Sequence, residues 1–173
     1  WLRTQAEKNE KYFASTLSAR GPIRPKKSSV IKAALKEIRE ENLKESVDWF
    51  STFHTRYHAD ASPNGHVTAL KAKLVEMTKK SKFPVTVEEI SHESTQQHSL
   101  KVTITGSERP GEIIVLGGHA DSVNKAWGGG TRAPGSDDNA SGSAALIEAL
   151  RVLLMQKQPL RTVELLWYAG EEG

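Results

Sequence analysis

The sequence predicts an α/β protein whose sheet contains parallel strands, and three observations support this fold class. Residues 113–116 form a continuous β-branched apolar run, which is typical of a strand buried on both faces. Residues 141–155 carry apolar side chains at helical spacing, and residues 162–168 form a second apolar strand. A strand, a helix and a strand in this order make a right-handed parallel crossover. With 173 residues, the chain is also long enough for a core of three layers.

The segments before this crossover are predicted to be helical first. A serine at 28 or 29 can cap a helix that continues, or restarts, to about residue 58. A third helix is expected over residues 67–79. Residues 1–27 are interpreted as an N-terminal arm or pro-segment-like stretch, because one glycine and two prolines interrupt residues 21–25.

Two further strands are predicted between the helical part and the crossover. Pro84 ends the helical pattern, and apolar residues sit mostly one apart over 85–90. Leu100, Val102 and Ile104 alternate strictly with polar residues. Both patterns are typical of strands with one solvated face.

Composition excludes several classes of function. The net charge of +3 comes from residues 1–60, which hold 12 Lys/Arg against 8 Asp/Glu, whereas residues 61–173 hold 12 against 13. With no glycine-rich phosphate loop or aromatic-basic pattern either, we expect no nucleic-acid partner. No apolar run approaches the ~20 residues that cross a bilayer, so no membrane partner is expected. The chain has no cysteine, which excludes disulfides and thiolate metal ligands within it.

Three short acidic segments punctuate the last third of the chain. His119 follows the first predicted strand of the crossover, Asp138 lies just before its helix, and Glu172 follows its second strand. Parallel strands end at the same edge of a sheet, and ligands collect beyond the carboxyl ends of such strands. We therefore expect these three side chains to converge, although 53 residues separate the first from the last.

An imidazole and two carboxylates are a suitable ligand set for Zn²⁺. One carboxylate can bridge two ions, and a second carboxylate beside a ligand can take a proton from water. Asp121 could orient the His119 imidazole by accepting its other N–H. The alternative interpretation is that these are ordinary turn residues without a common function.

The three segments resemble the motifs of one enzyme family. The motifs are Gly117–Ser122, Ala133–Gly142 and Ala169–Glu172, and the similarity extends over roughly residues 40–173. They look like those of the co-catalytic di-zinc leucyl aminopeptidases of bacteria and fungi, in metallopeptidase family twenty-eight. The resemblance implies the zinc-exopeptidase fold, a three-layer α/β/α arrangement with a mostly parallel mixed central sheet. Residues 28–173 would be the N-terminal portion of that catalytic domain.

The resemblance also implies individual roles. His119 would bind one Zn²⁺, Asp138 would bridge two, Glu172 would bind the second, and Glu171 would be the general base. Asp121 would orient His119. Asp137 would take part through its geometry, and we predict a cis peptide bond between Asp137 and Asp138.

The family has two further metal ligands, an Asp and a His, that have no counterpart in residues 1–173. We therefore expect a second polypeptide segment to complete the site and the sheet. Without it, residues 162–168 would form an exposed apolar edge. Peptides are the expected substrates, and the family suggests a secreted enzyme.

Other functions remain open at the level of sequence. A single-zinc cyclotransferase or a carboxypeptidase-like amidase could use the same scaffold. A catalytically inactive interaction domain of this fold is an alternative from a different class.

Overall fold

The computed structural model describes residues 29–124 and 131–173, and the predicted arm over 1–27 lies outside these residues. Residues Ala34–Gly173 form one compact unit, which contains the four strands and all three acidic motifs. The helices are α2 (Ser29–Lys36), α3 (Glu40–Phe50), α4 (Gly65–Thr78) and α5 (Gly142–Met155). The strands are β1 (Val85–Ile90), β2 (Ser99–Ile104), β3 (Arg109–His119) and β4 (Arg161–Tyr168), and an irregular helical turn, η1 (Ser136–Ser141), precedes α5. None of the helices in these residues has the length and apolar character of a membrane span.

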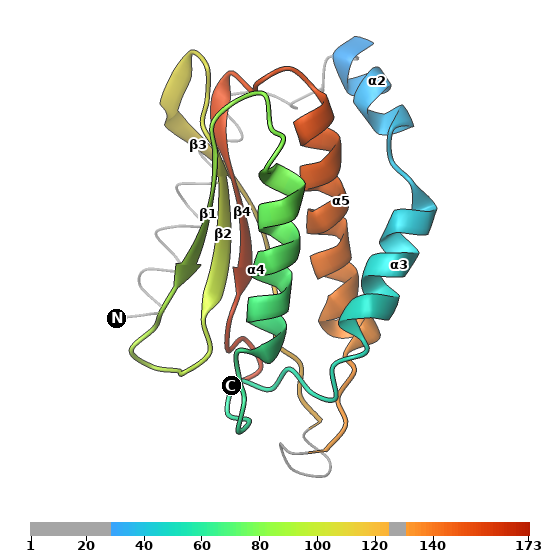
Figure 1. Ribbon diagram of the computed structural model, residues 1–173, viewed down its shortest axis with the longest axis vertical. Helices are drawn as coiled ribbons and strands as arrows, with labels where there is room; N and C mark the ends of the chain where they lie inside the picture. The colour runs from blue at the N-terminus through green and yellow to red at the C-terminus, as the bar shows by residue number, and fades with distance from the viewer. Residues whose placement is uncertain (1–28, 125–130) are drawn as a thin grey trace, which may run out of the picture. The chain divides into compact units, whose positions relative to one another are not determined.

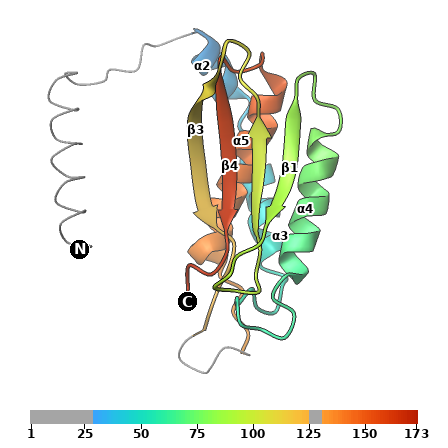
Figure 2. The same ribbon diagram turned by 90° about the vertical axis from the view of Figure 1, so that its left-hand side faces the viewer.

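The four strands form one mixed sheet in the order β1-β2-β4-β3 (Figure 2). β3 and β4 pair in parallel, and α5 connects them, so the predicted crossover is confirmed. β1 pairs with β2 and β2 with β4 in antiparallel fashion. The described residues therefore form a mixed α/β sheet, as the sequence predicted. Of the three strand pairs in the described residues, one is parallel and two are antiparallel.

Within Ala34–Gly173, helices α3, α4 and α5 lie on the same side of the sheet (Figure 1). α4 packs on β1 and β2, whereas α5 packs on β3 and β4 and α3 packs on α5. Alternate residues of the two central strands are fully buried beneath these helices, which confirms the alternation predicted for residues 100–104. The buried core contains Leu70, Leu74, Leu100, Val102, Ile104, Leu150, Leu165 and Trp167.

The prediction that residues 113–116 are buried on both faces is wrong for this chain. Ile113 and Val115 are 54% and 53% exposed, because β3 is an edge strand with no neighbour beyond it among the described residues. The exposed edge predicted at residues 162–168 is also wrong, because β3 lies beyond these residues and is itself the edge strand. β4 is a central strand between β2 and β3, and its Val163, Leu165 and Trp167 are buried.

The predicted helix over residues 29–58 is two helices that end at Phe50. Beyond Phe50 the chain turns, so that Phe53 packs edge-on against Phe50, with ring centroids 5.9 Å apart. The chain then carries Arg56 into the interior, where its side chain is 1% exposed. Helical periodicity could not predict where this helix ends. The end depends on tertiary contacts of the residues that follow Phe50, and not on a local capping sequence.

Glu148 of α5 fixes the start of α3. Its carboxylate accepts hydrogen bonds from the backbone N–H of Arg39 at 2.8 Å and from Asn42 Nδ2 at 3.1 Å. It also accepts two hydrogen bonds from the Arg151 guanidinium. The bonds from Arg151 are the main reason why the pKa of Glu148 falls to about 2. A carboxylate at a helix N-terminus stabilises the unpaired N–H groups there, so this contact ties α3 to α5.

His66 lies inside the aromatic cluster at the start of α4. It is 2% exposed and packs edge-on against Phe50 and Phe53. Its Nε2 atom has no hydrogen-bond partner among the residues described. Burial, assisted by the nearby charge of Arg56, lowers the pKa of His66 from 6.5 to about 3. The folded protein therefore holds this imidazole in its neutral form.

We predict that this histidine makes the full-length protein acid-sensitive. Between pH 6.5 and pH 3 the unfolded state binds a proton that the folded state excludes, so stability rises with pH in this window. At the acid end of this window, the buried histidine lowers the free energy of unfolding by up to about 5 kcal/mol. Denaturant unfolding of His66→Leu, which cannot be protonated, should show a correspondingly shallower loss of stability below pH 6.5. Parallel pH profiles for the two proteins would contradict this account.

Candidate metal centre

The parallel pairing of β3 and β4 places two of the predicted site residues at one edge of the sheet. His119 is the last residue of β3 and lies opposite Tyr168, the last residue of β4. The Ala120 N–H donates to the Tyr168 carbonyl oxygen at 2.7 Å, so the two strands stay paired up to their ends. Glu171 and Glu172 follow in the turn after β4. Asp138 comes from η1, at the start of the helix that packs on both strands.

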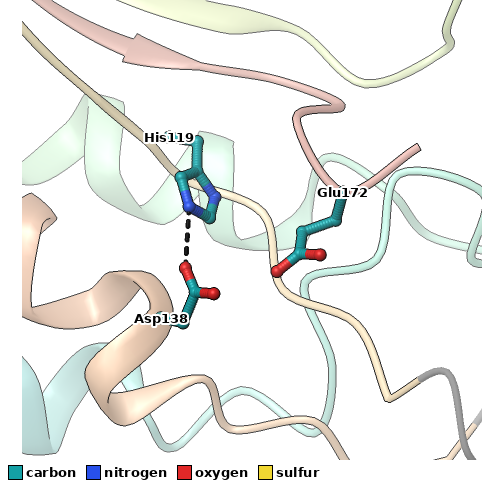
Figure 3. A group of neighbouring side chains, drawn as sticks. All are labelled: His119, Asp138 and Glu172. Carbon is teal, nitrogen blue, oxygen red and sulfur yellow. Dashed lines mark hydrogen bonds and ion pairs between the residues drawn. The ribbon is translucent and has the colours of Figure 1, made fainter.

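The side chains of His119, Asp138 and Glu172 point toward one another (Figure 3). One potential ligand atom from each lies within 4.8 Å of the others. His119 Nε2 is 2.9 Å from Asp138 Oδ1, and it is 3.9 Å from Glu171 Oε2. The convergence that the order of the segments predicts is therefore present in the structure. Glu171 lies at the border of this three-residue cluster.

The donor set fits a divalent metal ion. His119 is 13% exposed and Asp138 is 75% exposed, so the group combines a held imidazole with an accessible carboxylate. His119 Nδ1 is buried and makes no hydrogen bond within the described part of the chain, although Asp121 Oδ1 lies 3.3 Å away. A metal ion between His119 Nε2 and the two carboxylates would require the ring proton to be on Nδ1, which faces the Asp121 carboxylate. This is the arrangement that a histidine metal ligand needs.

Asp121 has a second function that the sequence did not reveal. It is fully buried, and its two carboxylate oxygens accept the backbone N–H groups of Glu171 at 3.2 Å and Glu172 at 3.0 Å. The carboxylate beside the His119 ring therefore also holds the turn that carries both glutamates. Because those N–H groups come from the third motif, Asp121 joins the first motif to the third.

The Asp137 side chain is exposed and is not a member of the metal-ligand cluster. Its carbonyl oxygen accepts a hydrogen bond from Ser141 Oγ at 2.6 Å. The cis peptide bond is between Asp138 and Asn139, so the predicted position, Asp137–Asp138, is wrong by one residue. Asn139 turns inward at this point, where its Oδ1 accepts the Gly142 N–H at 2.9 Å.

Two buried polar residues beside the site escaped sequence analysis. Arg56 and Gln97 are 1% and 0% exposed. Gln97 Oε1 accepts the Gly170 N–H at 3.0 Å, and its Nε2 donates to the Arg56 carbonyl oxygen at 2.9 Å. Neither residue belongs to a motif, and an isolated Arg or Gln in a polar segment is normally exposed. Only the fold indicates their importance.

The chain is similar to known proteins in both sequence and structure. The profile described as "Peptidase family M28" matches residues 100–173, which contain all three motifs. "Leucine aminopeptidase 1" of Trichophyton equinum is 33% identical over 160 residues, which make up 88% of this chain and 42% of that protein. A probable aminopeptidase of Saccharomyces cerevisiae is 35% identical over 152 residues, or 83% of this chain and 40% of that protein. The solved LapA aminopeptidase of Legionella pneumophila is 25% identical with a TM-score of 0.70, covering 88% of this chain and 42% of that one.

The fold thus places the chain in the zinc-exopeptidase structural class, as part of one domain. Residues 100–173 match the model of peptidase family M28, and this match confirms the resemblance indicated by the motifs. The chain spans about 42% of the length of the leucine aminopeptidase that it matches.

We predict that Asp121→Asn loosens the glutamate turn. An asparagine oxygen can accept one of the two backbone N–H groups, but its amide nitrogen cannot accept the other. A buried donor left unpaired costs about 1–3 kcal/mol. Hydrogen exchange of the metal-free, full-length protein should therefore be faster over residues 170–173 in this variant. Asp48→Asn, the same change at an exposed site on α3, is the control. Equal exchange in the two variants would contradict the tethering role.

Proposed function

We propose that the full-length protein is a zinc-dependent aminopeptidase that removes N-terminal residues from peptides. The observation that carries this proposal is the juxtaposition of His119, Asp138 and Glu172 at the carboxyl edge of two parallel strands. The match of residues 100–173 to the model of a peptidase family supports the reaction class. The names of the matching fungal proteins support cleavage after N-terminal, leucine-like residues.

Three side chains of this chain would hold zinc. His119 would hold one ion, Glu172 would hold a second, and Asp138 would hold both. Two ions per complete site are inferred from the family resemblance. When bound, zinc supplies a Lewis acid for the scissile carbonyl and lowers the pKa of water toward ~7.

Glu171 is proposed as the general base. Its carboxylate is 61% exposed, so it can reach a water and a substrate, and Oε2 lies 3.9 Å from His119 Nε2. Its backbone N–H is held by Asp121, which fixes the start of the side chain. Glu171 would take a proton from the attacking water as the oxygen bonds to the carbonyl carbon. It would then give that proton to the departing amine nitrogen as the C–N bond breaks.

A second polypeptide segment is proposed to complete the domain at the edge of β3. Ile113, Ile114 and Val115 are between 47% and 54% exposed, although they form a continuous apolar run. An open apolar edge strand is a template for pairing with another strand. The aminopeptidases that match this chain are more than twice its length, so their additional residues supply a candidate for this partner. That segment would also provide the remaining metal ligands.

Secretion of the enzyme is carried over from the resemblance alone, and comparing its abundance in culture medium and in cell extract would test it.

We predict that Glu171→Gln abolishes peptidase activity while zinc binding is retained. Glutamine has nearly the same shape but cannot accept a proton, so release of p-nitroaniline from leucine p-nitroanilide should fall about 10²–10⁴-fold. His119→Ala should instead lose zinc, measured by elemental analysis after dialysis. A full-length Glu171→Gln enzyme with more than a tenth of the original rate would refute its assignment as the base.

The same assays separate the proposed function from its alternatives. A cyclotransferase would form pyroglutamate from an N-terminal glutamine and would leave leucine p-nitroanilide intact. An inactive interaction domain would show no turnover of either substrate, and no tight zinc site in the full-length protein.

We predict that the exposed edge of β3 is covered in the full-length protein. Val115→Lys should then place a charge in an apolar contact and cost more than about 2 kcal/mol of unfolding free energy. Val75→Lys on α4 is the matched control, because Val75 is 47% exposed and Val115 is 53% exposed in this chain. Denaturant unfolding of both variants measures the difference. Equal losses would mean that β3 remains an open edge.

A further inference from the structure

Arg56 donates hydrogen bonds to the two backbone segments that carry His119 and Asp138. Its Nε donates to the carbonyl oxygen of Ala120, the residue after His119, at 2.7 Å. Its Nη2 donates to the carbonyl oxygen of Gly135 at 3.1 Å, and its Nη1 donates to that of Pro134. One buried guanidinium therefore spans the end of β3 and the loop that leads into η1.

The backbone of Arg56 extends this connection to the remaining motif. Its carbonyl oxygen accepts Gln97 Nε2, and Gln97 in turn accepts the Gly170 N–H. Its N–H donates to Ser122 Oγ at 3.2 Å, and Ser122 Oγ donates to the Ala133 carbonyl oxygen at 2.7 Å. All three motif segments are thus bonded, directly or through one side chain, to a single residue.

The loop before Asp138 is shaped around the guanidinium. Gly135 has a φ of 49°, in the left-handed region that favours glycine. A Cβ atom there would lie 2.7 Å from Arg56 Nη2 and 2.6 Å from Ser122 Cβ. Only the absence of a side chain at 135 lets the loop pack directly on Arg56.

The chemistry of these contacts requires an arginine. The planar guanidinium has five N–H donors in a fixed fork, whereas a lysine ammonium presents its donors from a single point. The acceptors come from different directions: Ala120 on one strand end, Phe50 at the end of α3, and the Pro134–Gly135 loop. A lysine could retain the positive charge but could not hold all of these segments together.

We infer that Arg56 is a positioning residue that sets the distance between His119 and Asp138 before any metal ion binds. This inference rests on the proposed metal site, because it assigns Arg56 an effect on metal affinity. Arg56 touches neither metal nor substrate and acts only through the backbone of the segments that carry the ligands.

The test is the zinc affinity of the full-length protein, measured by competition with a chromophoric chelator. Loss of a residue that orients metal ligands typically weakens metal binding 10–100-fold, and we expect Arg56→Lys to fall in this range. The absorption spectrum of the cobalt-substituted protein should also change, because the ligand geometry is altered. Val67→Ala is the control, since it removes core volume from α4, a helix that contributes no residue to the three motifs. It should lower the melting temperature and leave the zinc affinity within twofold.

Two results would overturn the inference. One is an Arg56→Lys protein that is destabilised but binds zinc within twofold of the original affinity. The other needs no variant: hydrogen exchange of the metal-free, original protein should already show protection of the Ala140 N–H, which donates to the Gly135 carbonyl oxygen. If this protection arises only when zinc is added, Arg56 does not set the ligands beforehand. An original protein that binds no zinc would instead refute the proposed metal site itself.

Discussion

The parallel pairing of β3 with β4 is the constraint on which the candidate site depends. Its register sets His119 opposite Tyr168, so both strands end at the same level of the sheet. The crossover through α5 then returns the Asp138 segment to that same edge. With an antiparallel pairing, the two strands would end at opposite edges, and His119 and Glu172 could not meet. Backbone hydrogen bonds between two strands therefore create a side-chain cluster from distant parts of the sequence.

Strand pairing brings the three segments together but does not hold their irregular backbone. Turns beyond the strand ends have N–H and C=O groups without a partner in the sheet, and such groups need partners when they are buried. Asp121 and Gln97 accept these N–H groups, and Arg56 donates to the carbonyl oxygens. The burial of a cation among carbonyl oxygens has a cost: it lowers the pKa of Arg56 to about 10. Arg56 thus remains charged at neutral pH.

The two edges of the sheet differ in character. β1 is a partly exposed strand with alternating polar side chains, as a solvated edge strand should have. β3 carries four consecutive apolar residues and no neighbour on its outer side among the described residues. The metal-ligand cluster lies at the end of β3. The proposed second segment, if it pairs with β3, would therefore lie beside the strand that ends at His119.

The sequence by itself determined the elements that follow from local periodicity and the site that follows from their order. The helix over Gly142–Met155, the alternation in β2, and the meeting of His119, Asp138 and Glu172 are all of this kind. Tertiary structure alone decided that β3 is an edge strand, that α3 ends at Phe50, and that Arg56 lies inside. A continuous apolar run has the same pattern in a central strand as in an edge strand that awaits a partner. The burial of Arg56 depends on carbonyl oxygens far away in the sequence, and no local pattern records where those oxygens will lie.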